Sequence, residues 1–351
     1  MMATNQESAG APLLEIEDLH TDIVLRHSVV HAVDGVSLKV KAGETLGIVG
    51  ESGCGKTMTG MSIMRLLPTG GAIVKGSIRL AGRDLVPLSE NEMHNVRGNE
   101  CAVIFQDPMT SLNPTMTIGK QVAEAILAHK KMTRADAMKR AEELLALVGM
   151  PRPKDRLRAY PHQLSGGLRQ RVVIAIALAG EPRLLIADEP TTALDVTIQA
   201  QILGLLDDLS ERLGMAILLI THDLGVIAGR ADRVAVMYAA KVVEEGPAEA
   251  IFHNPHHPYT KALLESIPRL DQVQEERLYS IPGIPPDLSS PPPGCRFAPR
   301  CQFATQVCRL TEPVLAGDSD HRFACHHPVG MAPAAMPSGA GTQPSVPGNP
   351  A

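Results

Sequence analysis

A glycine-rich loop that directly follows an apolar strand constrains the fold of this chain more than any other feature. The strand is expected over residues 44–49, the loop reads Gly-Glu-Ser-Gly-Cys-Gly-Lys-Thr over residues 50–57, and a helix should begin within residues 55–57 and run through Met64. Glycines let the backbone turn tightly enough to aim N–H groups at an anion, at the positive end of a helix dipole. The sequence therefore predicts a phosphate-binding loop in an α/β domain with a mostly parallel sheet.

Each residue of this loop has an expected part in binding ATP with Mg²⁺. Lys56 should contact the β- and γ-phosphates, and the Thr57 hydroxyl should ligate the metal ion. The rest of the loop should supply the remaining phosphate contacts; these residues are Gly50, Glu51, Ser52, Gly53, Cys54 and Gly55. A match to this pattern arises by composition in roughly one chain of this length in a hundred, so the interpretation needs further motifs.

A second apolar strand, expected over residues 184–187, leads into two carboxylates. Asp188 is expected to hold Mg²⁺, mainly through water, and Glu189 to orient or deprotonate the attacking water. Gln106 is a candidate ligand of Mg²⁺ or of that water. His222 should hydrogen-bond the γ-phosphate and hold Glu189 in place. Glu189, His222 and Gln106 are therefore the predicted catalytic residues.

In their order along the chain, these motifs resemble the nucleotide-binding subunits of ABC transporters over about residues 13–250. The resemblance also includes Leu-Ser-Gly-Gly at residues 164–167 and Ala-Leu-Asp at residues 193–195. It implies that Ser165 and the backbone of Gly166 and Gly167 contact the γ-phosphate held by a second subunit, and that Asp195 belongs to the nucleotide site. A serine hydroxyl and glycine amides at a helix N-terminus suit an anion.

The implied fold is an ABC-type P-loop ATPase domain with a RecA-like parallel sheet core, an antiparallel β subdomain and a helical subdomain. The domain should span residues 13–254, with the helical subdomain at about 107–165. Residues 1–12 and 331–351 are expected to be disordered, because they are too poor in apolar residues to build a core. The remaining elements expected from periodicity are helices over residues 135–148 and 197–212 and a strand over residues 216–220.

Residues 255–330 should form a small Cys-rich extension. Pro-His-His-Pro-Tyr at residues 255–259 and Ile-Pro-Gly-Ile-Pro-Pro at residues 281–286 are similar to the tail of oligopeptide and dipeptide importer ATPases. Four thiolates suit a [4Fe–4S] cluster or tetrahedral Zn²⁺, and the wide, uneven spacing favours the cluster. The candidate ligands are Cys295, Cys301, Cys308 and Cys325.

Two features depart from the family pattern: Cys54 stands where Ser is common, and the aromatic residue for the base is missing. ABC subunits usually stack adenine on an aromatic residue near the start of the chain, yet no Phe, Tyr or Trp precedes Phe105. Ile23 occupies the position that aligns with the aromatic residue, and His27 or His31 could substitute for it. We expect weak or unusual packing of the base, with the phosphates supplying most of the affinity.

The resemblance implies an ATPase that energises import of dipeptides or oligopeptides, peripheral on the cytoplasmic face of the inner membrane. It implies two transmembrane permease subunits, an extracytoplasmic peptide-binding protein and a second ABC ATPase subunit, as a heterodimer rather than a homodimer. The net charge of −5 gives no pull toward nucleic acid. The alternatives are import of nickel or another small solute and, from a different class, a soluble ABC ATPase in DNA repair or translation.

Overall fold

The computed structural model describes residues 11–192, 194–267, 281–318 and 320–330. The disorder predicted for residues 1–12 and 331–351 therefore lies outside the described residues, except at residues 11 and 12. In the described ranges, no helix is long and apolar enough to cross a bilayer.

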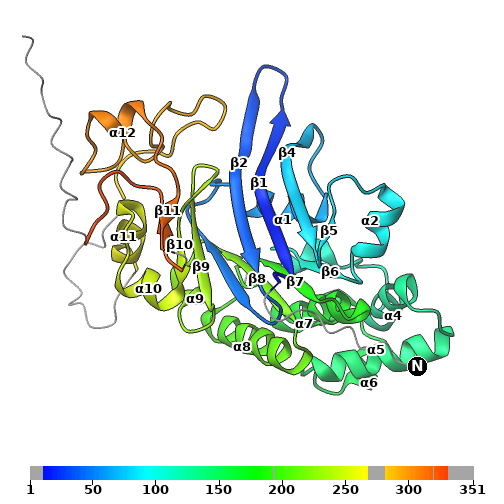
Figure 1. The fold of residues 1–351 in the computed structure, drawn as a ribbon. Coiled ribbons are helices and arrows are strands. Elements are labelled where there is room, and N and C mark those ends of the chain that lie inside the picture. The colour runs from blue at the N-terminus through cyan, green and yellow to red at the C-terminus, as the bar shows by residue number, and fades with distance from the viewer. Residues whose placement is uncertain (1–10, 193, 268–280, 319, 331–351) are drawn as a thin grey trace, which may run out of the picture.

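A mixed sheet, eight-stranded in the described residues, forms the centre of the molecule (Figure 1). Its parallel part contains, in spatial order, β6 (Cys101–Ile104), β7 (Leu184–Asp188), β8 (Ala216–Thr221), β3 (Thr45–Val49) and β9 (Arg233–Tyr238). Beyond β9 the sheet continues antiparallel with β10 (Lys241–Pro247), β12 (Arg322–Phe323) and β11 (Ala316–Gly317). Strands β3, β7 and β8 are buried along their whole length, which explains their continuous apolar sequences.

Alternate side chains of the core strands enter two separate hydrophobic clusters. In β7, Leu185 packs in the cluster that contains the long helices, whereas Leu184 and Ile186 pack in the cluster that contains α1 and the second sheet. The helices concerned are α1 (Lys56–Met64), α7 (Gly166–Ala177) and α8 (Val196–Leu213). The predicted strands at 44–49, 184–187 and 216–220 and the predicted helices at 55–64 and 197–212 are confirmed as β3, β7, β8, α1 and α8.

A second, antiparallel sheet stands over the α1 side of the core (Figure 1). Its order is β2–β1–β4–β5, formed by β1 (Leu14–Val24), β2 (Val29–Val40), β4 (Gly71–Leu80) and β5 (Arg83–Asp84). The hairpin of β1 and β2 brings Ile23 opposite Val30 in register. Ile23 and Val30 line the same cavity as the phosphate loop, so the end of the hairpin lies beside that loop.

Helices lie on opposite flanks of the two sheets (Figure 1). One flank carries α3 (Pro108–Ser111), α4 (Ile118–His129), α5 (Arg134–Leu147) and α6 (Pro153–Arg156), and the other carries α10 (Ala248–His253), α11 (Pro258–Glu265) and α12 (Gln306–Leu310). The remaining helices are α2 (Glu90–Val96) and α9 (Leu224–Ile227). Helix α5 confirms the helix predicted at 135–148; Thr133 caps its start and Gly149, at φ +68°, follows its end.

The C-terminal extension is continuous with the core sheet, since β12 pairs with β10. The carboxylate of Glu244 on β10 is fully buried and accepts hydrogen bonds from the backbone N–H groups of His256 (2.6 Å) and His257 (2.9 Å). The His257 ring in turn accepts a hydrogen bond from the N–H of Tyr259 (3.0 Å) and caps α11. The Pro-His-His-Pro-Tyr segment thus forms a joint between the core and the extension.

Candidate active site

The phosphate loop connects β3 to α1 in a backbone shape that requires glycine. Gly55 caps α1 at φ +102°, and a Cβ atom there would lie 2.4 Å from the carbonyl oxygen of Ala32. The buried Lys56 ammonium donates to the carbonyl oxygens of Gly50 (2.7 Å) and Glu51 (3.0 Å). Its charge therefore lies inside the loop, where phosphate oxygens would bind.

The two side chains expected to ligate Mg²⁺ lie next to each other beside the loop. The Thr57 hydroxyl donates to the Asp188 carboxylate at 3.1 Å, although the residues lie 131 positions apart in the sequence. Burial raises the pKa of Asp188, while the hydrogen bond from Thr57 opposes that rise. Hydroxyl and carboxylate oxygens are the ligands that Mg²⁺ prefers, with waters and substrate phosphates completing its coordination. Thr57 and Asp188 thus fit the expected metal ion.

The Glu189 carboxylate is hydrogen-bonded from several sides. Gln106 donates its amide N–H to it at 2.8 Å, the Thr192 hydroxyl donates at 2.8 Å, and Nδ1 of His222 lies 2.9 Å from it. Burial acts to raise the pKa of Glu189, but the hydrogen bonds from His222 and Thr192 outweigh burial and hold the pKa below its ordinary value. The carboxylate is therefore ionised at neutral pH and able to accept a proton.

These groups line one cavity of ≈ 480 Å³, a volume suited to a small-molecule ligand. Its lining consists of Ile23, Val30, Ala32, Ser52, Gly53, Gly55, Lys56, Thr57, Met58, Gln106, Glu189, Thr192, His222 and Leu288. Sequence reasoning did not identify Thr192 or Leu288. A hydroxyl three residues after Glu189 was a usable signal for Thr192, whereas nothing local marks Leu288.

The Leu-Ser-Gly-Gly segment lies outside this cavity. Ser165 is exposed at the N-terminus of α7, and a Cβ atom on Gly167 would lie 2.5 Å from Ile198 of α8. Asp195 is also exposed, and its carboxylate caps α8 by accepting from the N–H of Ile198 (3.0 Å). Among the described residues, neither the segment nor Asp195 therefore lines this chain's own cavity.

Two loop residues direct their side chains away from the cavity. The Glu51 carboxylate pairs with Arg300 of the extension, at 2.6 and 2.9 Å. Cys54 is buried, and burial raises the pKa of its thiol. Neither side chain lines the cavity, which leaves their backbone for contact with phosphate.

Ile23 lines the cavity, as its alignment with the missing aromatic residue predicts. The suggestion that His27 or His31 substitutes for that aromatic residue is wrong, because neither lines the cavity; Nδ1 of His31 instead contacts the Asp22 carboxylate at 2.8 Å.

The predicted [4Fe–4S] cluster, with Zn²⁺ as its alternative, is not supported. Within the ranges that the structure describes, no group of three or more His, Cys, Asp or Glu side chains is placed to hold a metal ion. Sγ of Cys325 accepts a hydrogen bond from the N–H of His327 at 3.3 Å. The four predicted ligands Cys295, Cys301, Cys308 and Cys325 are instead free cysteines in a small pocket.

Two family models match the chain. The model described as "ABC transporter" matches residues 33–192, and that described as "Oligopeptide/dipeptide transporter, C-terminal region" matches residues 243–308. The first spans the phosphate loop, Gln106, the Leu-Ser-Gly-Gly segment and Glu189. The second spans the Pro-His-His-Pro-Tyr joint and part of the extension.

Curated proteins similar to this chain are named as ATP-binding proteins of peptide transport. The chain is 54% identical to the oligopeptide transport ATP-binding protein OppD of Bacillus subtilis, over 89% of this chain and 87% of the relative. It is 54% identical to the dipeptide transport ATP-binding protein DppD of the same organism, over 86% of this chain and 90% of the relative. A solved dimeric ATP-binding cassette in a post-hydrolysis state, bound to ADP and Pi, matches with a TM-score of 0.60 at 28% identity, over 67% of this chain and 98% of that chain.

Proposed function

Because this chain belongs to the ATP-binding proteins of ABC transporters, we propose that it hydrolyses ATP to energise the import of dipeptides or oligopeptides. The observation that carries the proposal is that one chain contains both the site around Glu189 and a C-terminal region of the oligopeptide/dipeptide transporter type. Relatives named for oligopeptide and dipeptide transport share both regions with this chain at 54% identity.

In the proposed reaction, water attacks the γ-phosphorus of ATP and the bond from that phosphorus to ADP breaks. The ionised Glu189 accepts the proton of the attacking water, and His222 holds Glu189 and hydrogen-bonds the γ-phosphate. Lys56 binds the β- and γ-phosphates. When Mg²⁺ is bound by Thr57 and Asp188, it neutralises charge on the phosphate oxygens.

Gln106 has a separate proposed part. It follows strand β6 and precedes the helices α3–α6, and its amide contacts the catalytic carboxylate directly. A movement of these helices would therefore shift a hydrogen bond to Glu189. We propose that Gln106 links the helical region to the catalytic site and approaches Mg²⁺ or its water when nucleotide is bound.

The proposal includes a second ABC ATPase subunit, in a heterodimer rather than a homodimer. Ser165, Gly166 and Gly167 would contact the γ-phosphate in the cavity of that subunit, with Asp195 close to the shared site. The exposure of Ser165 at the start of α7, away from the chain's own cavity, supports this arrangement.

The complete transporter would contain two transmembrane permease subunits and an extracytoplasmic peptide-binding protein. The chain would lie on the cytoplasmic face of the membrane, attached through the permeases. These partners follow from the family, because an ATP-binding subunit needs permeases through which a solute can pass.

Purification of the tagged protein from detergent-solubilised membranes, followed by mass spectrometry, tests the proposal. Two permeases, a second ATPase and a peptide-binding protein should come with it. A nickel-binding or other solute-binding protein in place of the peptide-binding protein would support the alternative importer. Recovery only from the soluble fraction, alone or with ribosomes or DNA, would contradict a transport function.

A further inference from the structure

The ATP cavity has an apolar region formed by segments that are distant in sequence. Ile23 and Val30 face each other across the β1–β2 hairpin, and both line the cavity together with Ala32 and Leu288. The backbone N–H of His31, between Val30 and Ala32, donates to the carbonyl oxygen of Leu288 at 3.1 Å. This bond places Leu288 beside the hairpin, although some 250 residues separate them.

Leu288 lies in a tight turn, lines the cavity and packs against the hydrophobic core that contains the long helices. The N–H of Ser290 donates to the carbonyl oxygen of Asp287 at 3.2 Å, and the Asp287 carboxylate accepts from the N–H of Ser289 at 2.8 Å. Leu288 is thus the second residue of a four-residue turn with an Asp side-chain bond, a stable local structure. Pro285 and Pro286 restrict the backbone just before it.

The extension is also joined to the phosphate loop itself. Both guanidinium NH₂ groups of Arg300 bind the Glu51 carboxylate, and the Arg300 side chain is 4% exposed. Nε of the same guanidinium donates to the carbonyl oxygen of Pro282 at 2.9 Å. The backbone N–H of Glu51 donates to the hydroxyl oxygen of the buried Tyr259 at 2.8 Å. Arg300 therefore connects the loop to the segment that carries Leu288.

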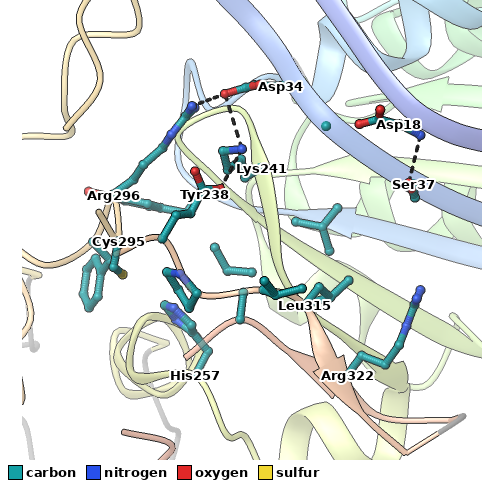
Figure 2. Close-up of a pocket in the computed structure, with 18 of the residues that line it drawn as sticks. Asp18, Asp34, Ser37, Tyr238, Lys241, His257, Cys295, Arg296, Leu315 and Arg322 are labelled. Atoms are coloured by element: carbon teal, nitrogen blue, oxygen red, sulfur yellow. Dashed lines mark hydrogen bonds and ion pairs between the residues drawn. The ribbon is translucent and has the colours of Figure 1, made fainter. Parts of the chain in front are cut away.

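A further ion pair holds the extension against the antiparallel sheet. Figure 2 shows Arg296 and Lys241 both pointing to Asp34 on β2. The Arg296 side chain is buried, and it also donates to the carbonyl oxygen of Ala239. The segment around Leu288 thus lies between fixed contacts to β2 and to the phosphate loop.

We propose that Leu288 and Ile23 form the surface on which the nucleotide base packs, so that the C-terminal extension contributes to this chain's own part of the ATP site. This inference rests on the proposed ATP-binding function and adds to it the residue that takes the place of the missing aromatic side chain. A purine ring has apolar faces that gain dispersion and burial against aliphatic side chains. Lys56 and the loop bind the triphosphate, and the adjacent apolar surface receives the base.

The test compares the binding of a ligand with a base and a ligand without one. Dissociation constants for the non-hydrolysable analogue AMP-PNP and for inorganic tripolyphosphate, each with Mg²⁺, are measured by calorimetry on the full-length chain. Leu288→Ala should weaken AMP-PNP binding about fivefold, the order expected when a leucine loses part of its apolar contact, and leave tripolyphosphate binding unchanged. Ile284→Ala is the matched control, because Ile284 lies in the same segment with 86% of its surface exposed; neither ligand should be affected.

Leu288→Met keeps a long apolar side chain and should retain most of the AMP-PNP affinity. Unchanged AMP-PNP binding in a folded Leu288→Ala protein, or an equal loss for both ligands, would overturn the role of Leu288 in base packing. The role of Leu288 would also be overturned if the wild-type chain bound AMP-PNP no more tightly than tripolyphosphate. A wild-type chain that binds neither ligand would overturn the ATP-binding function itself.

Discussion

At the scale of single residues, the hydrogen bonds around Glu189 determine its protonation. Burial favours the neutral acid, while the contacts from His222 and Thr192 favour the ion and dominate. The backbone at Glu189 has φ +47°, a conformation uncommon outside glycine. The backbone and the hydrogen bonds together fix one orientation of the carboxylate, which a general base requires.

Glu189→Gln should therefore preserve ATP binding and abolish the transfer of a proton from water. Hydrolysis should fall by about 10³-fold or more, the scale of a lost general base, and the variant should accumulate as an ATP-bound dimer with the proposed second ATPase subunit. Phosphate release and size-exclusion chromatography of the two subunits together, in the presence of ATP, measure the two effects. Glu124→Gln, at an exposed site on α4, is the control, and wild-type hydrolysis by the Glu189 variant would refute the assignment.

His257 links stability to pH. The side chain is 1% exposed, and burial lowers its pKa to about 3. The folded state therefore holds the neutral ring, while the unfolded chain takes up a proton near the ordinary pKa of about 6.5. Between these two pKa values the unfolded state binds more protons than the folded state. The contribution of the neutral His257 ring to the free energy of unfolding is therefore complete above pH 6.5 and is lost as the pH falls toward 3.

His257→Asn keeps a cap acceptor for α11 and removes this titration. Between pH 7.5 and 5.5 the wild type should lose free energy of unfolding at up to about 1.4 kcal/mol per pH unit from this group, and the variant should lose correspondingly less. Thermal unfolding at both pH values measures the two losses. Each protein is compared with itself at the two pH values, so any change in stability that the substitution causes at every pH cancels. An equal drop in both proteins would show that His257 does not titrate as inferred.

At the scale of elements, the extension and the phosphate loop form one packed unit. The hydrogen bonds that Arg300 donates to the Glu51 carboxylate raise the pKa of Arg300, and its guanidinium lies 5.7 and 5.9 Å from the ring centres of Tyr238 and Phe297. Tyr259 packs against both aromatic rings. The loop is therefore supported from the side opposite the cavity.

Arg300→Gln should remove this support and leave the Glu51 carboxylate without its cation. Breaking a largely buried ion pair costs about 3 kcal/mol, which lowers the Tm of a chain of this size by about 4 °C, at about 1.4 °C per kcal/mol. Thermal unfolding and limited proteolysis of the extension measure the effect. Arg309→Gln, at an exposed site on α12, should change neither; a comparable Tm for both variants would contradict a supporting role for Arg300.

The elements also show what sequence can predict. Strands β3, β7 and β8 were predictable because both their faces are buried and their sequences are continuously apolar. The two-residue strands β11 and β12 show no periodicity, and Leu288 reaches the cavity through a contact across most of the chain. Cysteine spacing cannot report where the side chains lie in space, and the cluster prediction failed because no group of three or more His, Cys, Asp or Glu side chains in the described residues is placed to hold a metal ion.

At the scale of the whole molecule, the catalytic groups collect at the carboxyl edge of the parallel sheet. Thr57 follows β3, Asp188 ends β7 and His222 follows β8. Parallel strands end on a common edge, where ligands bind in open α/β sheets, so the meeting of these residues was predictable from motif order. The Leu-Ser-Gly-Gly segment lies outside this cavity, and the proposed site is complete only when a second ATPase subunit docks.

Uptake of a labelled oligopeptide by proteoliposomes containing the assembled transporter, with ATP on the side of this chain, tests the central claim most directly. Wild-type complexes should accumulate the peptide only with ATP. Complexes carrying Glu189→Gln should contain the same subunits, bind ATP and accumulate no peptide above the level without ATP. Peptide uptake that continues at the wild-type rate in a complex assembled with the Glu189→Gln chain would contradict the account.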